Sequence, residues 1–185
     1  MNESETISYT IALHNHRVAA WGAGIAASVR NVCTFKVQTG VAILEASGFS
    51  PDLHDPEQLP PPKEVDTVHR GWRATVIREA ALREKTFSHG QAAKLINSYL
   101  KVRFVCGGHH DHVNVQGLHP PIDRLLLDAL VREDVGGHQK DWRRFRNRAW
   151  SKFTSEEYQE VIDLIRFSIP GRPLWEIEQY WRGYQ

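Results

Sequence analysis

The sequence has too few cysteines for a disulfide-stabilised fold and no apolar stretch long enough to cross a membrane. Its two cysteines, Cys33 and Cys106, lie far apart in the 185-residue chain, which favours a reducing compartment. No run of about 18 apolar residues occurs. The N-terminus, MNESETISYTIALHNHRV, lacks the basic start and apolar core of a signal peptide. We therefore expect a soluble cytoplasmic protein without a membrane partner.

The chain also lacks an excess of charge of either sign. Lysine and arginine total 23 and aspartate and glutamate total 22, which gives a formal net charge of +1. Any nucleic-acid site would therefore have to be a local basic patch. The Walker-type loop and the motifs Gly-x-Ser-x-Gly and Gly-x-Gly-x-x-Gly are missing from the sequence. Their absence leaves nucleoside-triphosphate, hydrolase-elbow and dinucleotide sites without support.

The sequence predicts one mostly α-helical domain without internal repeats. It comprises a short N-terminal part (1–50), a proline-rich connector (51–63) and a helical core (64–185). In the N-terminal part, Gly22, Gly24 and Gly40 weaken a helical interpretation of 17–47, so a short strand around 41–45 is the alternative. In the core, apolar residues at helical spacing predict helices at 65–84, 91–104, 122–131, 154–167 and 174–184.

Two of these helices carry candidate catalytic residues. In TFSHGQAAKLINSYLKV, Lys94 lies off the apolar face, and in HPPIDRLLLDAL, Asp123 follows a proline pair at a helix start. Together these segments, within residues 80–132, resemble the helix-hairpin-helix (HhH-GPD) DNA glycosylases, particularly the 8-oxoguanine DNA glycosylase type. In that family a hairpin precedes a helix with a nucleophilic lysine, and an aspartate begins a later helix. Of the family's Leu-Pro-Gly-Val-Gly hairpin, this sequence has only Gly90.

The resemblance implies a helical bundle that binds DNA and cleaves the N-glycosidic bond of a damaged or modified base, without a cofactor. Lys94 would be the nucleophile and could form a Schiff base, which permits strand cleavage. Asp123 would stabilise the positive charge that builds on the sugar. We expect Lys101 and Arg103 to be cationic neighbours of Lys94, and His89, Gly90 and Lys101 to contact DNA.

A structural role is the alternative for both candidate residues. An aspartate after proline at a helix start is an ordinary N-cap. A lysine off the apolar face is normally solvated. A non-catalytic helical module that binds nucleic acid or a protein partner is therefore the second hypothesis.

A basic segment with interleaved aromatic residues, KDWRRFRNRAWSK, predicts contacts with nucleic-acid phosphate. Trp142, Phe145 and Trp150 could stack bases or anchor the segment in the core, and on an amphipathic helix Trp142 and Phe145 would face inward. The phosphate contacts would come from the arginines of its outer face, Arg143, Arg144, Arg146 and Arg148. The alternative is that these arginines pair with the acidic helix that follows, between Glu156 and Asp163.

Two further motifs are a histidine-rich loop and an arginine–histidine pair. The loop CGGHHDHVNVQGLH places five potential zinc ligands close together, but their spacing matches no established zinc pattern. We expect a polar loop that binds no metal; the five residues are Cys106, His109, His110, His112 and His119. The spacing of Arg83 and His89 is similar to that of the catalytic pair in HEPN ribonucleases, which gives a third hypothesis.

Overall fold

Every regular element in the computed structural model is a helix. The structure describes residues 8–29 and 32–183, and apart from an isolated bridge between Val29 and Cys33 that part of the chain contains no β-structure. The mostly helical fold expected from the sequence is thereby confirmed. Within the described residues, no helix is long and apolar enough to cross a membrane. The start of the N-terminal segment that was compared with signal peptides lies outside the described residues.

The chain begins with two helices that pack closely, α1 (Ile11–Ala27) and α2 (Val37–Ala46). A β-carbon added at Gly40 would lie 2.9 Å from the Gly24 backbone and 2.9 Å from the Phe35 ring. The glycines that weaken the helical pattern thus permit the close approach of two helices. The strand considered around 41–45 is wrong, because those residues form the second half of α2, where Ile43 and Leu44 are buried.

The connector contains a short 3₁₀ helix, η1 (Pro56–Gln58), and leads into an antiparallel helix pair, α3 (Val65–Ala81) and α4 (His89–Leu100). The α4 helix continues as π-helical turns, η2 (Lys101–His109), and is followed by the short α5 (Val113–Gln116). Helices α1 to α5 surround one apolar core, to which α4 contributes Leu95, Ile96 and Tyr99. We call this part of the molecule the first lobe.

The second lobe has its own apolar core, which includes Trp142, Tyr158 and Ile162. The helix predicted at 154–167 runs from Ser155 to Ser168 and is the longest of this lobe, and Thr154 caps its N-terminus. The last 3₁₀ helix ends at Tyr180, earlier than the sequence predicts, and Tyr184 lies outside the described residues. The helices of this lobe are α6 (Arg124–Arg132), η3 (Val135–Gly137), α7 (Gln139–Arg148), η4 (Trp150–Lys152), α8 (Ser155–Ser168) and η5 (Leu174–Tyr180).

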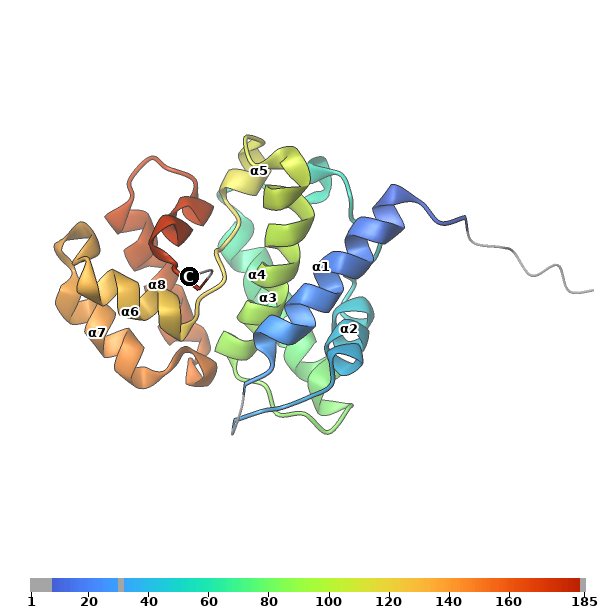
Figure 1. Ribbon diagram of the computed structural model, residues 1–185, viewed down its shortest axis with the longest axis horizontal. Helices are drawn as coiled ribbons and strands as arrows, with labels where there is room; N and C mark the ends of the chain where they lie inside the picture. The colour runs from blue at the N-terminus through green and yellow to red at the C-terminus, as the bar shows by residue number, and fades with distance from the viewer. Residues whose placement is uncertain (1–7, 30–31, 184–185) are drawn as a thin grey trace, which may run out of the picture.

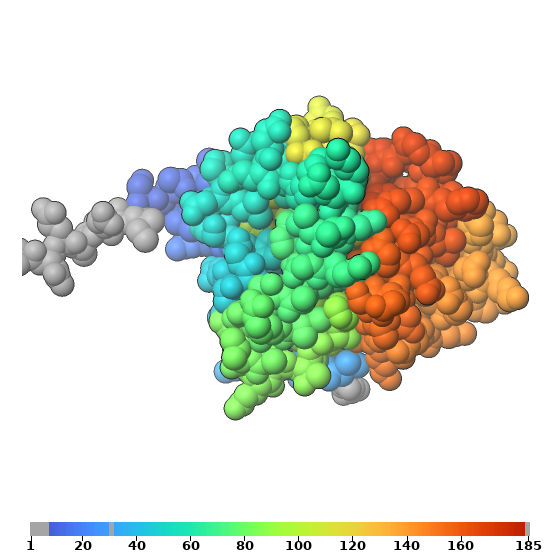
Figure 2. Space-filling model, turned by 180° about the vertical axis from the view of Figure 1, so that it is seen from behind, coloured from blue at the N-terminus to red at the C-terminus, as the bar shows by residue number. Residues whose placement is uncertain are grey.

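The helix α4 lies between the two lobes and belongs to both (Figure 1). Its residues from Gly90 to Leu100 are all buried, and Ala93 packs in the second core while its neighbours Ala92 and Leu95 pack in the first. Seen from behind, α3 and α8 meet along the seam between the lobes (Figure 2). A polar side chain on the side of α4 that faces the second lobe therefore lies at the interface between the two lobes.

The close approach of α1 and α2 gives a first prediction. Gly40→Ala should lower the free energy of unfolding by about 1–3 kcal/mol, because its methyl group would overlap the Gly24 backbone and the Phe35 ring. The matched control is Gly71→Ala in the middle of α3, where an added β-carbon meets nothing within 4 Å. That change should raise stability by up to about 1 kcal/mol. Urea denaturation measures both, and equal effects of the two substitutions would contradict this packing.

Candidate active site

The structure brings Lys94 and Asp123 together between the lobes. Lys94 Nζ lies 2.9 Å from Asp123 Oδ2, and Lys94 is only 7% exposed. The solvated position considered for this lysine is therefore wrong. A buried amine paired with a carboxylate is an arrangement that proton transfer and nucleophilic chemistry both use.

Each oxygen of Asp123 has a different partner. Oδ1 accepts a hydrogen bond of 2.9 Å from the backbone N–H of Leu126, so Asp123 is the N-cap of α6, as one interpretation of the sequence predicted. Oδ2 accepts from Lys94 and, at 3.1 Å, from the Trp181 indole N–H. The helix cap and the ion pair therefore coexist, and the cap fixes the carboxylate in front of the lysine.

The segment between α5 and α6, called the linker below, carries Asp123 and is held by a second residue of α4. Asn97, which is fully buried, donates from Nδ2 to the Pro120 carbonyl oxygen at 2.9 Å. Asn97 follows Lys94 by three residues and therefore lies on the same side of the helix. Because α4 is attached to the linker both at Pro120 and at Asp123, the position of the carboxylate relative to the lysine is fixed from two sides.

Lys94 and Asp123 line a cavity of about 200 Å³. The cavity is narrow and mostly apolar, but it also exposes a second lysine, a second carboxylate and an indole ring. Its wall is formed by Gly22 and Ala26 of α1, Lys94 and Ser98 of α4, Lys101 and Val102 of η2, Pro121 and Asp123 of the linker, and Glu178 and Trp181 near the C-terminus. Such a mixture of apolar surface and a few convergent polar groups is typical of a small-molecule site.

The second lysine in the cavity is also paired. Lys101 forms an ion pair with Glu178 and lies 5.6 Å from the Trp181 ring centroid. Burial raises the pKa of Glu178, and the charge of Lys101 opposes that effect. Lys94 Nζ has its own aromatic neighbour, the Trp150 ring, at 6.0 Å. The cavity thus exposes two amines, two carboxylates and the Trp181 indole, and the Trp150 ring lies beside one of the amines.

Two of these residues, Glu178 and Trp181, were missed as candidates, whereas Trp150 belongs to the basic segment whose aromatic rings could stack bases. Their role depends on how the second lobe folds back onto α4, which no local spacing in the sequence reports. The helical pattern of the C-terminal segment placed Trp181 on the apolar face, which was the one available signal. Arg103, expected beside Lys94, instead donates to the carbonyl oxygens of Ala12, Pro51 and Leu53. It fixes the proline-rich connector against the first lobe.

The arginines of the basic segment are exposed on α7, and Trp142 and Phe145 are buried as predicted. Their side chains bond to neighbouring polar groups of the second lobe. The pairs are Arg143 with Gln139, Arg144 with Glu160, Arg146 with Asp128, and Arg148 with Glu157. Two of the four partners lie on the following acidic helix, as the alternative interpretation stated. Phosphate contact by these arginines stays a prediction.

The hairpin residues expected to contact DNA are packed inward. The Gly90 N–H donates to the Phe153 carbonyl at 3.4 Å, and a β-carbon at Gly90 would lie 1.8 Å from the Trp150 carbonyl oxygen. In this structure Gly90 serves the contact between α4 and the second lobe, and a phosphate could not reach it. His89 is half-buried at the start of α4.

The ribonuclease pair and the histidine loop do not form sites of their own. Arg83 donates to the carbonyl and the carboxylate of Glu79, one turn back on α3, so it is engaged away from His89. In the loop, His112 lies near Glu57, His110 near Trp175 and His109 near Phe104, while Cys106 is exposed. Among residues 8–29 and 32–183, no three metal-binding side chains are close enough to hold one ion.

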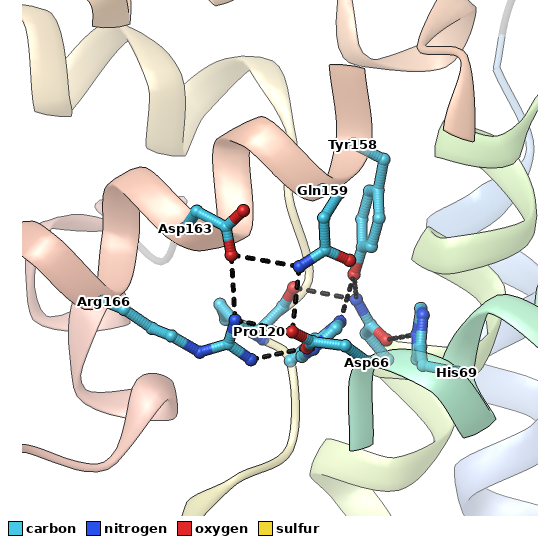
Figure 3. Close-up of polar contacts among 9 residues, drawn as sticks. Asp66, His69, Pro120, Tyr158, Gln159, Asp163 and Arg166 are labelled. Atoms are coloured by element: carbon cyan, nitrogen blue, oxygen red, sulfur yellow. Dashed lines mark hydrogen bonds and ion pairs between the residues drawn. The ribbon is translucent and has the colours of Figure 1, made fainter. Parts of the chain in front are cut away.

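The fifth loop residue, His119, belongs to a polar network that connects the lobes. Figure 3 shows three labelled members of this network, Asp66, Tyr158 and Arg166. The Asp66 carboxylate of α3 can only accept, so His119 Nε2 donates to it at 2.8 Å, and His119 Nδ1 then accepts from the Tyr158 hydroxyl at 3.1 Å. Arg166 of α8 also donates to Asp66. Tyr158 in turn accepts from Asn97, the residue that holds the linker.

The ionisation of this network follows from its burial. Burial lowers the pKa of His119 and of His69, whose Nε2 bonds to Asn97, so both rings are neutral near pH 7. Burial alone would raise the pKa of Asp66, but hydrogen bonds from His119 and Arg166 outweigh it and hold the pKa well below its usual range. The contact between the lobes thus depends on neutral histidines and an ionised aspartate.

This network gives a pH-dependent prediction. Unfolded histidines take up protons below about pH 6.5, whereas His119 and His69 resist protonation in the folded state. Their contribution to stability is therefore complete above that pH and is lost as the pH falls through it, by up to about 1.4 kcal/mol per pH unit for each ring. Denaturant titrations between pH 8 and 5 should show this slope in the wild type and the exposed control His54→Gln. His119→Asn should reduce it; an unchanged slope would contradict this origin.

Comparison with known proteins assigns no family to this chain. It matches no protein-family model, no curated protein and no solved structure. The features that bear on function are therefore the Lys94–Asp123 pair and the cavity that it lines.

Proposed function

We propose that the chain is a DNA glycosylase that uses Lys94 as its nucleophile and Asp123 as its electrostatic partner. The observation that carries the proposal is the buried pair at 2.9 Å, which faces a cavity between two lobes. The sequence offered both residues as candidates, and their contact in the folded chain supports the proposal. A purely structural ion pair would have no need of the adjoining cavity.

The chemistry begins with the proton shared by the pair. An ammonium group cannot attack, and at 2.9 Å Asp123 Oδ2 is close enough to accept a proton from Lys94 Nζ. The free amine then attacks C1′ of the sugar as the glycosidic bond breaks, and the base leaves with the bonding electrons and takes up the proton that Asp123 accepted. Asp123 is thereby a carboxylate again and stabilises the positive charge that develops on the sugar and on the attacking nitrogen. Opening of the sugar ring gives a Schiff base on Lys94, from which β-elimination can break the 3′ strand bond.

The cavity suits a base that has left the double helix. A nucleobase removed from the duplex loses its stacking, and aromatic side chains replace that contact. Trp181 lies in the cavity wall and Trp150 lies beside Lys94. Glu178 and Lys101 supply a carboxylate and an amine within the same space. These groups offer a stacked base both an acceptor and a donor for hydrogen bonds.

The proposed phosphate contacts are the arginines of α7. Glu160 is exposed and Asp128 is partly exposed, and ion pairs in such positions contribute little to stability. Backbone phosphates can therefore compete with Glu160 and Asp128 for Arg144 and Arg146. Arg143, which bonds only a glutamine amide oxygen among the described residues, is the least committed of the four.

The test uses duplexes that carry a panel of damaged and modified bases, with borohydride added to reduce a Schiff base. We expect a covalent protein–DNA adduct for the wild type and its complete loss in Lys94→Gln, which keeps a side chain able to bond Asp123. Lys101→Gln, which removes the other amine of the cavity, should still form the adduct but more slowly, and the matched control is the exposed Lys36→Gln, which should form it at the wild-type rate. Asp123→Asn should slow base release by about 10²-fold or more.

Two outcomes would contradict the glycosylase proposal or the role of Lys94 in it. If the panel yields neither adducts nor abasic sites, the glycosylase proposal fails and a non-catalytic module becomes the better hypothesis. If abasic sites form without an adduct, and Lys94→Gln retains them, the enzyme uses water and the proposed role of Lys94 is wrong.

A further inference from the structure

The arginines of α7 lie on two sides of that helix, and each side borders a different surface cavity. Arg143, Arg146 and Asn147 have the spacing of one helical face and line a cavity of about 300 Å³ between α6 and α7, called the α6–α7 groove below. Arg144 lines a cavity of about 370 Å³ on the other side, between α7 and α8, called the α7–α8 groove. In Figure 1, α6 and α7 lie at the end of the molecule away from the first lobe.

The two grooves carry opposite charge. The charged residues that line the α6–α7 groove are three arginines and one carboxylate, Arg132, Arg143, Arg146 and Asp128. Those that line the α7–α8 groove are one arginine and three carboxylates, Arg144, Asp141, Glu160 and Asp163. The chain as a whole has a formal net charge of only +1, so this separation is local. A polyanion is attracted to the first groove and repelled from the second.

The single carboxylate in the lining of the α6–α7 groove does not neutralise the arginines around it. Asp128 is shared by two guanidiniums, with Arg146 Nε at 2.7 Å and Arg124 Nε at 3.4 Å. Both arginines are exposed and Asp128 is partly exposed. Ion pairs in such positions contribute at most about 1 kcal/mol, so an incoming anion can replace them.

The other two arginines face this groove from different helices. Arg132 of α6 bonds through Nε to Glu133, its neighbour in the sequence, and Arg143 of α7 bonds through Nη2 to the uncharged amide oxygen of Gln139. Both arginines are exposed. A guanidinium has several N–H donors in a fixed fork, so each can keep its present bond and still donate to an anion. Phosphate oxygens accept two parallel hydrogen bonds from such a fork.

The arginines on the other side of α7 are held more firmly. Arg144 bonds Glu160 and also stacks on the Phe145 ring, with 4.3 Å between the guanidinium carbon and the ring centroid. Arg148 bonds Glu157 in the first turn of α8. A phosphate at Arg144 would in addition meet the carboxylates of the α7–α8 groove. We therefore expect the strongest phosphate contacts on the side of α7 that faces α6.

We propose that the α6–α7 groove binds the phosphate backbone of a nucleic-acid strand through Arg132, Arg143 and Arg146. This site rests on the DNA binding of the proposed function, but it does not depend on the chemistry of Lys94. It adds Arg132 to the contacts proposed for α7. Asp123 caps the start of α6 and Arg132 is the last residue of that helix. One helix therefore connects the proposed catalytic pair with the groove, over roughly 14 Å along its axis.

The experiment measures binding of the full chain to a fluorescently labelled, undamaged duplex by anisotropy at several concentrations of sodium chloride. Arg132→Gln, Arg143→Gln and Arg146→Gln should each weaken binding about three- to tenfold and lower the slope of log affinity against log salt by about one. Arg144→Gln, in the same segment but beside three carboxylates, is the matched control and should stay close to the wild type. Asp128→Asn should tighten binding, because it removes the competing carboxylate.

The failures of the groove and of the proposed function are distinguishable. If the wild type binds the duplex and Arg143→Gln weakens binding no more than Arg144→Gln, the groove is wrong and DNA binding stands. If the wild type does not bind the duplex at low salt, the groove and the proposed function both fail. If the groove variants weaken binding but no damaged duplex gives an adduct with borohydride, the groove stands and the glycosylase proposal fails.

A competition experiment identifies the source of the phosphate. Sodium phosphate replaces sodium chloride at equal ionic strength while the labelled duplex is bound. A backbone that contacts several arginines at once should be displaced equally by the two salts. Specific displacement by millimolar phosphate, lost in Arg143→Gln, would show a site for a free small anion and overturn the assignment to a nucleic-acid backbone.

Discussion

The ion pair between Lys94 and Asp123 is the interaction on which the rest of the structure depends. It joins α4, the helix shared by both cores, to Asp123, the N-cap of α6 in the second lobe. One carboxylate oxygen is committed to the helix cap and the other to the lysine. Removal of either partner would leave the other charge buried without compensation, which is far more costly than the loss of an exposed pair. The site and the contact between the lobes are therefore one feature.

The polar network behind this pair explains how so small a cavity can be held in place. Asn97 bonds the linker at Pro120 and also the Tyr158 hydroxyl, and Tyr158 continues through His119 to Asp66. These contacts connect α3, α4, the linker and α8 in one chain of hydrogen bonds. A buried polar chain of this kind is stable when its donors and acceptors are matched. Arg73, beside Tyr158, departs from that rule, because its guanidinium nitrogens have no hydrogen-bond partner among the described residues.

Most of the fold, and the central pair of the site, could be predicted from the sequence. The helical spacing around Tyr158 and Ile162 and the cap at Asp123 are local signals, and the structure has both. The solvated position considered for Lys94 is wrong, because its contact with Asp123 depends on the packing of distant segments. The remainder of the site comes from distant segments. Glu178 and Trp181 reach the cavity because the C-terminus returns to α4, and the arginines of α7 find carboxylates on two other helices. Periodicity along one helix contains no information on such contacts.

The most direct test of the central claim is to locate the covalent bond itself. Peptide mapping by mass spectrometry of the borohydride-reduced adduct, formed with a duplex that the wild type processes, identifies the modified amine. We expect the remnant of the sugar on Lys94, because that amine is paired with Asp123 at the cavity. A remnant on Lys101, the other amine that lines the cavity, or on any lysine outside the cavity would contradict the proposed role of Lys94 as the nucleophile.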